Sequence, residues 1–517
     1  MDKDLFGRVF AVVVFSGLTI FGFGFAIYLI YNANNPYSYF LAFSYLILSI
    51  IAGFFNTFTA YSYYRSYLYD NYLKKIKSRL KKLTKYPKVC IAVAIFNEDP
   101  EIVRKNIRQL LNLNYPKNKL EFYVLDDSND LEKMNLIKKY SKEYGYNYIH
   151  RDDRKGYKAG ALNNLMNYTT AEFIAIFDYD EYLENNNFLI DLLPFFDDEK
   201  MAYVQTEKRY RKSTFFSDTI DLFDAFFFKF IQPSRALNNT AIFAGSCGVI
   251  RSSSLRKIGG FPEYVIEDTF FSFESDINGF KSLYVPEVYA YGEPIKTFTE
   301  LVKQQWRYNY GDTQFLGYFV EKFRQKKAKR NLTPLSNIDY MTHGFGLNYI
   351  SVIVILFTLI SIMIVFSQFP IANLDLLNIL SSKYLNFDLE LLGAGALFVS
   401  ILAPVILTKI YFKSAKKGIM IFLLNFALAF VRAKAAFSAI FRKKYKVIWD
   451  REIKSKNNLY KRAIYAVKNS VLEIIFAAIL FALGIFATLI NNTFGGVWLL
   501  WYGILYISTF VMFYVYR

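Results

Sequence analysis

The sequence predicts an α/β domain inserted between transmembrane α-helices, and three observations lead to this prediction. Six apolar stretches approach the length of about 20 residues that a helix needs to cross a bilayer. They lie at residues 9–30, 39–60, 344–366, 391–408, 474–490 and 497–516. Between the second and third stretches, residues 61–343 alternate short apolar runs with helical patterns, which is typical of a sheet covered by helices. Basic residues also gather beside some of the apolar stretches and not beside others.

Composition excludes several other classes of protein. The 517 residues are 54% hydrophobic and 19% aromatic, which is far too apolar for a disordered chain. The two cysteines, Cys90 and Cys247, lie in apolar runs and offer no disulfide framework. The two histidines, His150 and His343, exclude a site built from three imidazoles. The net charge of +18 fits a nucleic acid or an anionic membrane surface, and the positions of the charges decide between them.

The positions of the basic residues predict how the chain sits in a membrane. Residues 71–88, directly after the second stretch, contain eight basic residues and no acid. Residues 322–330 contain six basic residues, and residues 442–462 contain nine basic residues and two acids. The other short loops, 31–38, 368–389 and 491–496, carry one Lys among them. Six crossings with both termini in the cytoplasm put every basic cluster on one side, as the positive-inside bias requires. The charge therefore indicates membrane sidedness, and we expect no nucleic-acid partner.

One apolar segment, 418–431, is only fourteen residues long and ends at Arg432 and Lys434. A crossing there would move 442–462 to the outer side, so an interfacial or re-entrant helix at about 418–440 is favoured. The first stretch is too long for a signal-peptide core and is interpreted as an anchor. The predicted organisation is summarised by four ranges: two transmembrane helices in 1–60, a cytoplasmic domain with interfacial helices toward its end in 61–343, and, in 344–517, four further transmembrane helices with a basic cytoplasmic loop at about 442–462.

Within the central block, apolar runs that end in polar residues predict a parallel sheet. The expected strands are 89–95, 122–125, 146–150 and 173–177, and the expected helices are 99–111 and 158–167. Open α/β sheets bind ligands beyond the carboxyl ends of their strands. We therefore expect Asn97, Asp127 and Asp178 to cluster at one edge.

Three charged segments are candidates for chemistry. Asp178 and Asp180, two residues apart after an apolar strand, could share a divalent cation, although an acidic turn at a sheet edge has the same composition. The cations of 151–160 precede a predicted helix and would suit a diphosphate, or they form a solvated loop. Asp126 and Asp127 could accept hydrogen bonds from a base or ribose, or they precede a helix cap at Ser128 or Asn129.

Taken in order, these segments resemble family-2 glycosyltransferases with the GT-A fold, and in particular the membrane-embedded cellulose, chitin and hyaluronan synthases. The resemblance spans about residues 89 to 311 and depends on the order and spacing of its motifs. These are Val-Cys-Ile-Ala-Val-Ala-Ile-Phe-Asn-Glu at 89–98, Leu-Asp-Asp-Ser at 125–128, Lys-Ala-Gly-Ala-Leu-Asn at 158–163, Asp-Tyr-Asp at 178–180, Phe-Ala-Gly-Ser at 243–246, Gly-Gly-Phe at 259–261, Ile-Glu-Asp at 266–268 and Gln-Gln-Trp-Arg-Tyr at 304–308. Residues 442–456, with Trp449, are faintly similar to the cytoplasmic gating segment of these synthases.

The resemblance implies a GT-A (Rossmann-like) domain and a metal-dependent, inverting hexosyltransferase, with a role for each matching residue. Asp268 is expected to be the catalytic base, with Glu267 beside it, and Asp178 and Asp180 are expected to hold Mg²⁺ or Mn²⁺. The expected donor-binding residues are Ala94, Phe96, Asn97, Glu98, Asp126, Asp127, Lys158, Asp178 and Arg307. The expected acceptor-binding residues are Gly245, Ser246, Gln304 and Tyr308.

Two residues depart from the family pattern. Ile266 replaces a Thr and leaves both neighbouring carboxylates in place. Tyr308 replaces the Trp that stacks against the acceptor sugar in processive members, which weakens the argument for processivity. Trp306 is interpreted as an interfacial anchor and His343 as structural.

The resulting prediction is an integral plasma-membrane enzyme that takes a nucleotide-diphosphate sugar, expected to be UDP-linked, at the cytoplasmic face. It extends a sugar polymer and translocates it through the bilayer. One alternative is a single transfer to a lipid-linked acceptor such as a polyprenyl phosphate or a glycolipid. A further alternative, a transporter or channel with a ligand-sensing domain, is disfavoured because the six stretches contain no charged residue.

Overall fold

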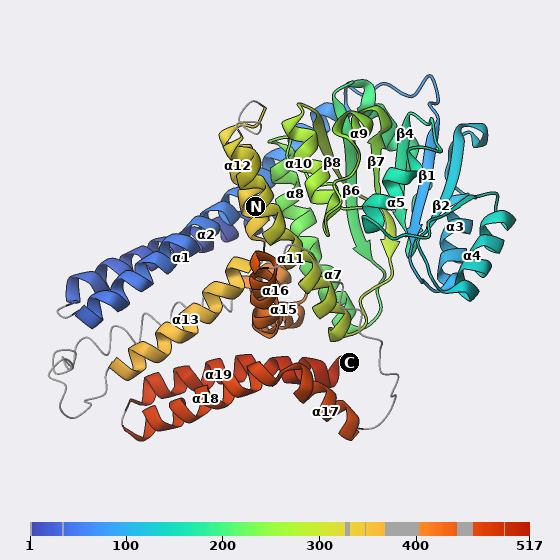
Figure 1. The fold of residues 1–517 in the computed structure, drawn as a ribbon. Coiled ribbons are helices and arrows are strands. Elements are labelled where there is room, and N and C mark those ends of the chain that lie inside the picture. Colours follow the sequence, from blue (N-terminus) through green and yellow to red (C-terminus); the bar gives the residue numbers. More distant parts are fainter. Residues whose placement is uncertain are drawn as a thin grey trace.

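The computed structural model describes residues 3–33, 36–325, 331–346, 348–367, 403–441, 459–490 and 492–517. Figure 1 shows the sheet with its helices at one end of the molecule and long helices extending away from it. The predicted loop 368–389 lies outside the described residues, as do much of the predicted span 391–408 and most of the basic loop 442–462, including Trp449.

The central domain contains one sheet of eight strands in the order β3-β2-β1-β4-β7-β6-β8-β5. The strands are β1 (Val89–Ile95), β2 (Leu120–Asp126), β3 (Asn147–His150), β4 (Phe173–Asp178), β5 (Glu181–Leu183), β6 (Met201–Tyr210), β7 (Gly248–Arg251) and β8 (Lys281–Gly292). The four strands expected from sequence are confirmed and are parallel. The expectation of a parallel sheet is wrong beyond β4, because β7 runs antiparallel to both β4 and β6, and β5 runs antiparallel to β8. The sheet is therefore mixed. The sequence did not reveal this, because apolar runs predict strands but not their direction.

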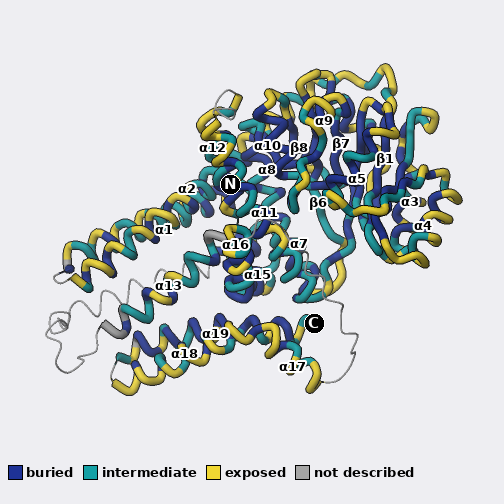
Figure 2. The backbone as a smooth tube through the Cα atoms, viewed as in Figure 1, coloured by how far each residue is buried: buried dark blue, intermediate teal, exposed yellow. Residues whose placement is uncertain are grey.

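Helices cover both faces of the sheet because its central strands are apolar on both sides. Along β1, Ile91 and Val93 pack into one hydrophobic cluster while Cys90 and Ala92 pack into the other, as the alternation of side chains in a strand requires. The helices of the domain are α3 (Pro100–Leu110), α4 (Leu131–Glu143), α5 (Tyr157–Leu165), α6 (Phe188–Leu192), α7 (Phe215–Phe226), α8 (Gln232–Ala236), α9 (Ser252–Ile258) and α10 (Glu267–Ile277), with shorter turns at Lys117–Lys119, Leu193–Asp197 and Phe227–Ile231. Figure 2 shows the strands as the most deeply buried part of the molecule.

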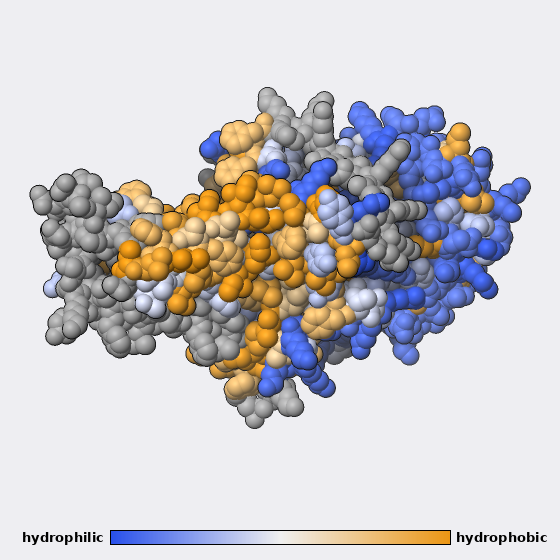
Figure 3. All heavy atoms as spheres, turned by 90° about the horizontal axis from the view of Figure 1, so that it is seen from below, coloured by the Kyte–Doolittle hydropathy of each residue, from blue (hydrophilic) through white to orange (hydrophobic). Residues whose placement is uncertain are grey.

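Four described helices are long and apolar enough to cross a membrane, at Asp4–Tyr31, Pro36–Lys77, Val471–Leu489 and Gly495–Val515. They belong to α1 (Lys3–Asn32), α2 (Pro36–Lys77), α18 (Val471–Leu489) and α19 (Thr493–Val515). Figure 3 shows an apolar surface over much of the molecule away from the hydrophilic end. Large apolar side chains such as Ile20, Ile27 and Ile479 are exposed on these helices, as expected for surfaces that contact lipid.

Two pairs of bent helices accompany the four. Helix α12 (Pro334–Phe345) meets α13 (Asn348–Ser367) at 65°, and α15 (Ala415–Ala427) meets α16 (Ala429–Phe441) at 43°. If each pair counts as one span, the described residues provide up to six. The short apolar helix Ala403–Phe412 overlaps the end of the predicted stretch 391–408 and extends beyond it. The interfacial or re-entrant position of 418–440 stays a prediction, since a bent pair fits a broken span equally well.

Helix α11 (Phe298–Arg324) joins the sheet domain to the apolar helices. It begins with a capping box between Thr297 and Glu300 and packs against α12 and α16. Phe298 and Leu301 at its start share a hydrophobic cluster with Leu424 of α15 and Phe513 of α19. The last helix of the set, α17 (Leu459–Asn469), packs on α19. The residues at 304–308 are thereby fixed between the sheet and the membrane helices.

Candidate active site

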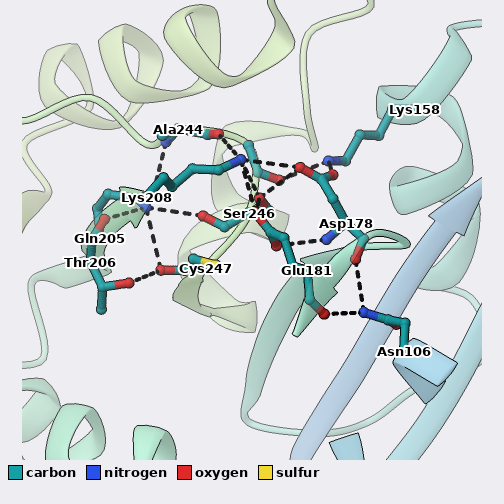
Figure 4. Close-up of polar contacts among 11 residues, drawn as sticks. Asn106, Lys158, Asp178, Glu181, Gln205, Thr206, Lys208, Ala244, Ser246 and Cys247 are labelled. Atoms are coloured by element: carbon teal, nitrogen blue, oxygen red, sulfur yellow. Dashed lines mark hydrogen bonds and ion pairs between the residues drawn. The ribbon is translucent and has the colours of Figure 1, made fainter. Parts of the chain in front are cut away.

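Asp178, the last residue of β4, lies at the centre of a network of charged side chains (Figure 4). Its Oδ1 is 2.5 Å from Nζ of Lys158, in the first turn of α5, and its Oδ2 is 3.1 Å from Nζ of Lys208, near the end of β6. Lys158 also donates to the carbonyl of Gly245 at 2.9 Å. The side chains of Asp178 and Lys158 are 31% and 25% exposed, so a ligand can reach them.

Ser246 and Glu181 complete this network (Figure 4). The buried Ser246 hydroxyl accepts a hydrogen bond from Lys208 at 2.5 Å and lies 2.8 Å from Asp178 and 2.6 Å from Glu181. Glu181 also accepts a hydrogen bond from the backbone N–H of Asp178 and pairs with Lys208 at 3.1 Å. Asn106 of α3 donates to the carbonyls of Asp178 and Glu181, which fixes the turn after β4 (Figure 4).

The two lysines determine the charge of Asp178. Burial alone would raise the pKa of its carboxyl group, but the ammonium groups of Lys158 and Lys208 outweigh burial and hold the pKa well below its usual range. Asp180 behaves in the opposite way. Burial and repulsion from Asp178 and Glu181 raise the pKa of Asp180 to about 7, and no described cation lies within 4 Å of its carboxylate.

These residues fit a divalent cation of the kind that binds together with a substrate. Among the described residues, no three His, Cys, Asp or Glu side chains converge closely enough to enclose an ion. Mg²⁺ rarely uses such a cage, because it is usually held by one or two carboxylates together with substrate phosphates and water. The crowded, unpaired carboxylate of Asp180 beside Asp178 suits such a metal, since the mutual repulsion that raises its pKa would be relieved by a cation.

Glu267 and Asp268 form the first turn of α10 on the other side of the Gly245 loop. The backbone N–H of Thr269 donates to Oδ1 of Asp268 at 2.8 Å. A Cβ on Gly245, whose φ is +81°, would lie only 3.2 Å from Oδ2 of Asp268 and 3.9 Å from Nζ of Lys158. Asp268, Lys158 and Asp178 therefore lie close together around Gly245, and these surroundings of Gly245 are called the hollow below. Burial raises the pKa of Asp268, and burial together with Asp268 raises that of Glu267 to about 7.

Two other motif glycines are required by close packing around this hollow. A Cβ on Gly160 would lie 2.0 Å from the carbonyl oxygen of Lys155, and one on Gly260 would lie 2.5 Å from Oδ1 of Asn163. The Asn163 side chain exchanges two hydrogen bonds with the backbone of Phe261. The Lys-Ala-Gly-Ala-Leu-Asn segment is thus tied to the Gly-Gly-Phe turn that leads to Asp268.

Helix α11 carries two of the predicted acceptor residues, Gln304 and Tyr308. Tyr308 is 36% exposed, and the charges of Asp224, Lys208 and Asp268 act on its hydroxyl. The guanidinium of Arg307 lies over the Tyr308 ring at 5.3 Å and is close enough to Glu267 and Asp268 for their charges to act on it. The side-chain Oε1 of Gln304 is buried without a hydrogen-bond partner among the described residues.

The predicted nucleoside-binding residues line the ends of β1 and β2, where each has a protein partner. Asp126 accepts hydrogen bonds from the Tyr148 hydroxyl at 2.6 Å and from the Ser128 backbone, and Asp127 forms a two-point ion pair with Arg151. The residue that caps α4 is Asp130, so a cap at Ser128 or Asn129 is wrong.

The end of β1 completes this side of the site. Asn97, at φ +57°, bridges to Ser128 and Asn129 through hydrogen bonds. Ala94 pairs with Asp178 across the sheet, and the Arg154 guanidinium stacks on the ring of Phe96 at 3.3 Å. Glu98 is hydrogen-bonded to Tyr179, and burial raises its pKa to about 7. Asn97, Asp127 and Asp178 therefore share one edge of the sheet, but Asn97 and Asp127 use their side chains to hold the loops together.

Several residues of the site were not predicted from sequence. Lys208 is the most important, and it reaches Asp178 only because β7 and β8 flank β6 in the sheet. Arg432 of α16 is fully buried and donates to Oε1 of Gln305 at 3.0 Å and to Asn425 of α15 at 3.2 Å. It links the bent apolar pair to the helix that carries Arg307 and Tyr308. No local sequence signal distinguishes Lys208 or Arg432 from an ordinary surface cation.

Comparisons with known proteins relate part of the chain to glycosyltransferases. Residues 90–259 match the profile of glycosyl transferase family 2. The chain is 30% identical over 236 residues to the UDP-forming cellulose synthase catalytic subunit of Pseudomonas fluorescens, covering 44% of this chain and 31% of that protein. It is 32% identical over 244 residues to probable glucomannan 4-beta-mannosyltransferase 7 of Oryza sativa subsp. japonica, covering 44% and 40%. The chain thus spans less than half the length of these relatives.

A solved structure has a similar fold. Mannosyltransferase PcManGT from Pyrobaculum calidifontis, determined in complex with GDP-Man and Mn²⁺, superposes with a TM-score of 0.50 at 16% identity. The superposition covers 75% of this chain and 97% of that one. At this identity the likeness concerns the fold, which is of the GT-A type in both.

Proposed function

We propose that this chain, whose central domain is a family-2 glycosyltransferase domain related to those of cellulose and glucomannan synthases, is an inverting, metal-dependent transferase that extends a polysaccharide at the cytoplasmic membrane face. One observation supports this above the others. Asp178 and Asp268 come from distant parts of the sequence and approach a single hollow, where Lys158 contacts Asp178 and the Gly245 carbonyl while Asp268 lies against Gly245. A diphosphate and an attacking hydroxyl could therefore be bound side by side.

At the donor end, the chain's own cations would bind the leaving nucleoside diphosphate. Lys158 and Lys208 are already oriented by Asp178, and Arg307 can grip a phosphate through two parallel hydrogen bonds. Asp178 and Asp180 would hold Mg²⁺ or Mn²⁺, which supplies Lewis-acid stabilisation of the diphosphate when bound. Asp126 and Asp127 would face the nucleoside, with Arg151 and Tyr148 fixing their orientation.

At the base end, Asp268 would accept the proton of the acceptor hydroxyl. As this O–H bond breaks, the acceptor oxygen bonds to the anomeric carbon, and the bond between that carbon and the diphosphate oxygen breaks. The diphosphate departs with the electron pair. Burial raises the pKa of Asp268, which makes it a stronger base than an exposed aspartate. Attack from the face opposite the leaving group inverts the configuration, so an α-linked donor gives a β-linked product.

The acceptor and the donor follow from the relatives and from the membrane helices. The relatives include a UDP-forming cellulose synthase catalytic subunit and a probable glucomannan 4-beta-mannosyltransferase, and a mannosyltransferase of similar fold binds GDP-Man, which together favour a UDP- or GDP-linked hexose and a polymer product. Helices long enough to cross a membrane flank the domain on both sides, which suits a polymer that leaves through the bilayer. A second candidate is a single transfer to a lipid-linked acceptor, and Tyr308 in place of the family's Trp favours it.

The test is a screen of sugar nucleotides with the full-length, detergent-purified protein. We expect one of UDP-glucose, UDP-N-acetylglucosamine or GDP-mannose to release nucleoside diphosphate, with activity lost in EDTA and restored by Mg²⁺ or Mn²⁺. Labelled products that grow in length support the polymer, whereas a single sugar on an extracted lipid supports the second candidate. Release that persists in EDTA would contradict the metal role, and release by the Asp268→Asn variant at the wild-type rate would contradict the base.

A further inference from the structure

A crevice lies between the first two apolar helices and α12, away from the charged network around Asp178. Its volume is about 460 Å³. Its walls are formed by Phe23 of α1, by Ile50, Phe54 and Phe58 of α2, and by Leu335 and Ile338 of α12. Gly53 and Thr57 also line it, and a Cβ on Gly53 would lie 3.0 Å from the ring of Phe23. These walls suit a hydrocarbon chain and would not stabilise a sugar.

The length and position of the crevice match one leaflet of a bilayer. Ile50 and Tyr61 at its two ends are eleven residues apart on α2, which corresponds to about 16 Å of helix. The hydrocarbon core of a bilayer is about 30 Å thick, so each leaflet contributes about half of that. Residues 36–60 of α2 contain no charge, and Arg65 is the first charged residue beyond them. The crevice therefore ends where the lipid phosphates are expected.

Arg65 provides the charge at this end. Its Nη1 is 2.5 Å from the hydroxyl of Tyr61, which lines the crevice, and its guanidinium lies over the Tyr61 ring at 5.3 Å. Its Nε is buried without a hydrogen-bond partner among the described residues, and none of their carboxylates comes within 4 Å of the guanidinium. Asp339 lines the crevice, is 1% exposed and accepts hydrogen bonds from Asn238 and Thr240, and the charges of Arg235 and Arg65 act on its carboxylate. Two guanidinium groups therefore lie near one carboxylate at the head of the crevice.

We propose that this crevice binds an anionic glycerophospholipid, with one acyl chain between α1, α2 and α12 and the phosphate at Arg65. A guanidinium that has no carboxylate within 4 Å among the described residues, at the end of an apolar slot of one-leaflet length, favours a ligand that combines a negative headgroup with a hydrocarbon chain. The lipid would also brace α12, whose His343 lies 3.1 Å from the Thr269 hydroxyl, beside Asp268. The proposal concerns a site separate from the catalytic hollow and does not depend on the reaction.

The test uses the full-length protein in nanodiscs that contain a trace of phosphatidylglycerol with a photoreactive acyl chain, and a parallel sample with the phosphatidylcholine analogue. We expect phosphatidylglycerol to label residues 50–61 and 335–339 several-fold more strongly than phosphatidylcholine does. Arg65→Gln should lower the labelling by phosphatidylglycerol about tenfold, because it removes a charge-assisted contact. Lys75→Gln, an exposed cation ten residues further along the same helix, should leave it unchanged and serves as the matched control.

A second variant tests the slot independently of the charge. Thr57→Trp fills the crevice while keeping Arg65, and should abolish labelling at both segments. Retained turnover of sugar nucleotide would establish that each variant is folded. Equal labelling of wild type and Arg65→Gln, or equal labelling by the two lipids in the wild type, would overturn the proposal. Labelling in Thr57→Trp at the wild-type level would overturn it as well.

Discussion

The donor end and the base end of the hollow shift the pKa values of their carboxyl groups in opposite directions. At the donor end, Asp178 is contacted by two ammonium groups, and the pKa of its carboxyl group is held low. At the base end, none of the described cations lies within 4 Å of Asp268, and burial raises the pKa of its carboxyl group. The same residue type is thus prepared for two tasks by its surroundings: a permanent anion that orients cations, and a proton acceptor.

This difference predicts that variants at the two ends fail in different ways, and the largest effect is expected at the base end. Asp268→Asn keeps the shape of the side chain but cannot accept a proton, so kcat should fall about 10² to 10⁴-fold. The affinity for the sugar nucleotide should stay within a factor of about three, since Asp178, Lys158 and Lys208 are untouched. Nucleoside diphosphate release measures the first quantity, and equilibrium binding of the donor measures the second.

The matched control is Glu199→Gln, which removes an exposed carboxylate from the loop before β6. It should leave both quantities unchanged. If Asp268→Asn weakened donor binding as strongly as turnover, the two ends would not be separate, and the interpretation of Asp268 as a base would be wrong.

At the donor end, Lys208→Met should act mainly on binding. It leaves Asp178 with one cation and removes a charge-assisted hydrogen bond to Ser246, so kcat/KM for the sugar nucleotide should fall about 10- to 100-fold. We expect most of the change in KM, because no proton is transferred at this end. Lys212→Met, an exposed lysine just beyond the same strand, serves as the control in the same steady-state assay. A fall in kcat alone would contradict the assignment of Lys208 to donor binding.

The residues that sequence could reveal and those that it could not differ in what brings them to the site. Asp178 lies at the end of an apolar strand, and Lys158 lies at the start of a helix. Both patterns are local in the sequence, so the positions of these two residues were predictable. Asp268 was found only through the order of the motifs. Lys208 depends on the placement of β6 between β7 and β8, which requires pairings distant in sequence. A polar segment such as 205–210 carries no period that would reveal such pairings.

The same reasoning explains the fold. The four parallel strands and the helices after the first and third of them were predictable from apolar runs, which are clearest in β1 and β4, where almost every residue is apolar and buried. The direction of β7 was not predictable, since a four-residue strand looks alike in either orientation. For the membrane helices, hydropathy found the long segments but not the 65° and 43° bends within two helix pairs.

The two ends meet at Gly245, and substitution there should disturb both by a smaller amount. In Gly245→Ala the new methyl group would lie 3.2 Å from Asp268 Oδ2, and an L-residue is strained at φ +81°. Misplacing the carboxylate by a few tenths of an ångström should lower kcat about tenfold. Gly279→Ala has the same φ of +81°, but its nearest neighbour is 3.6 Å away.

Comparing the two alanine variants separates strain from contact. Both should lose similar free energy of unfolding, of about 1 kcal/mol, in a thermal or denaturant titration. Only Gly245→Ala should lose activity per folded molecule. Equal activity losses in the two variants would mean that backbone strain, and not the approach to Asp268, explains the effect.

The smallest effect concerns pH and tests which acid of the base end ionises first. Activity requires ionised Asp268, so kcat/KM should rise as the pH increases through a pKa that lies above the ordinary aspartate value. Burial and the charge of Asp268 raise the pKa of Glu267 to about 7, so Glu267 is still protonated while Asp268 ionises. Glu267→Gln keeps this neutral form, so the rise should stay in place. Above the rise, kcat/KM should change less than about tenfold, because the base is retained. A pH profile of donor turnover measures both, and a rise that moves to lower pH would mean that Glu267 is ionised before Asp268.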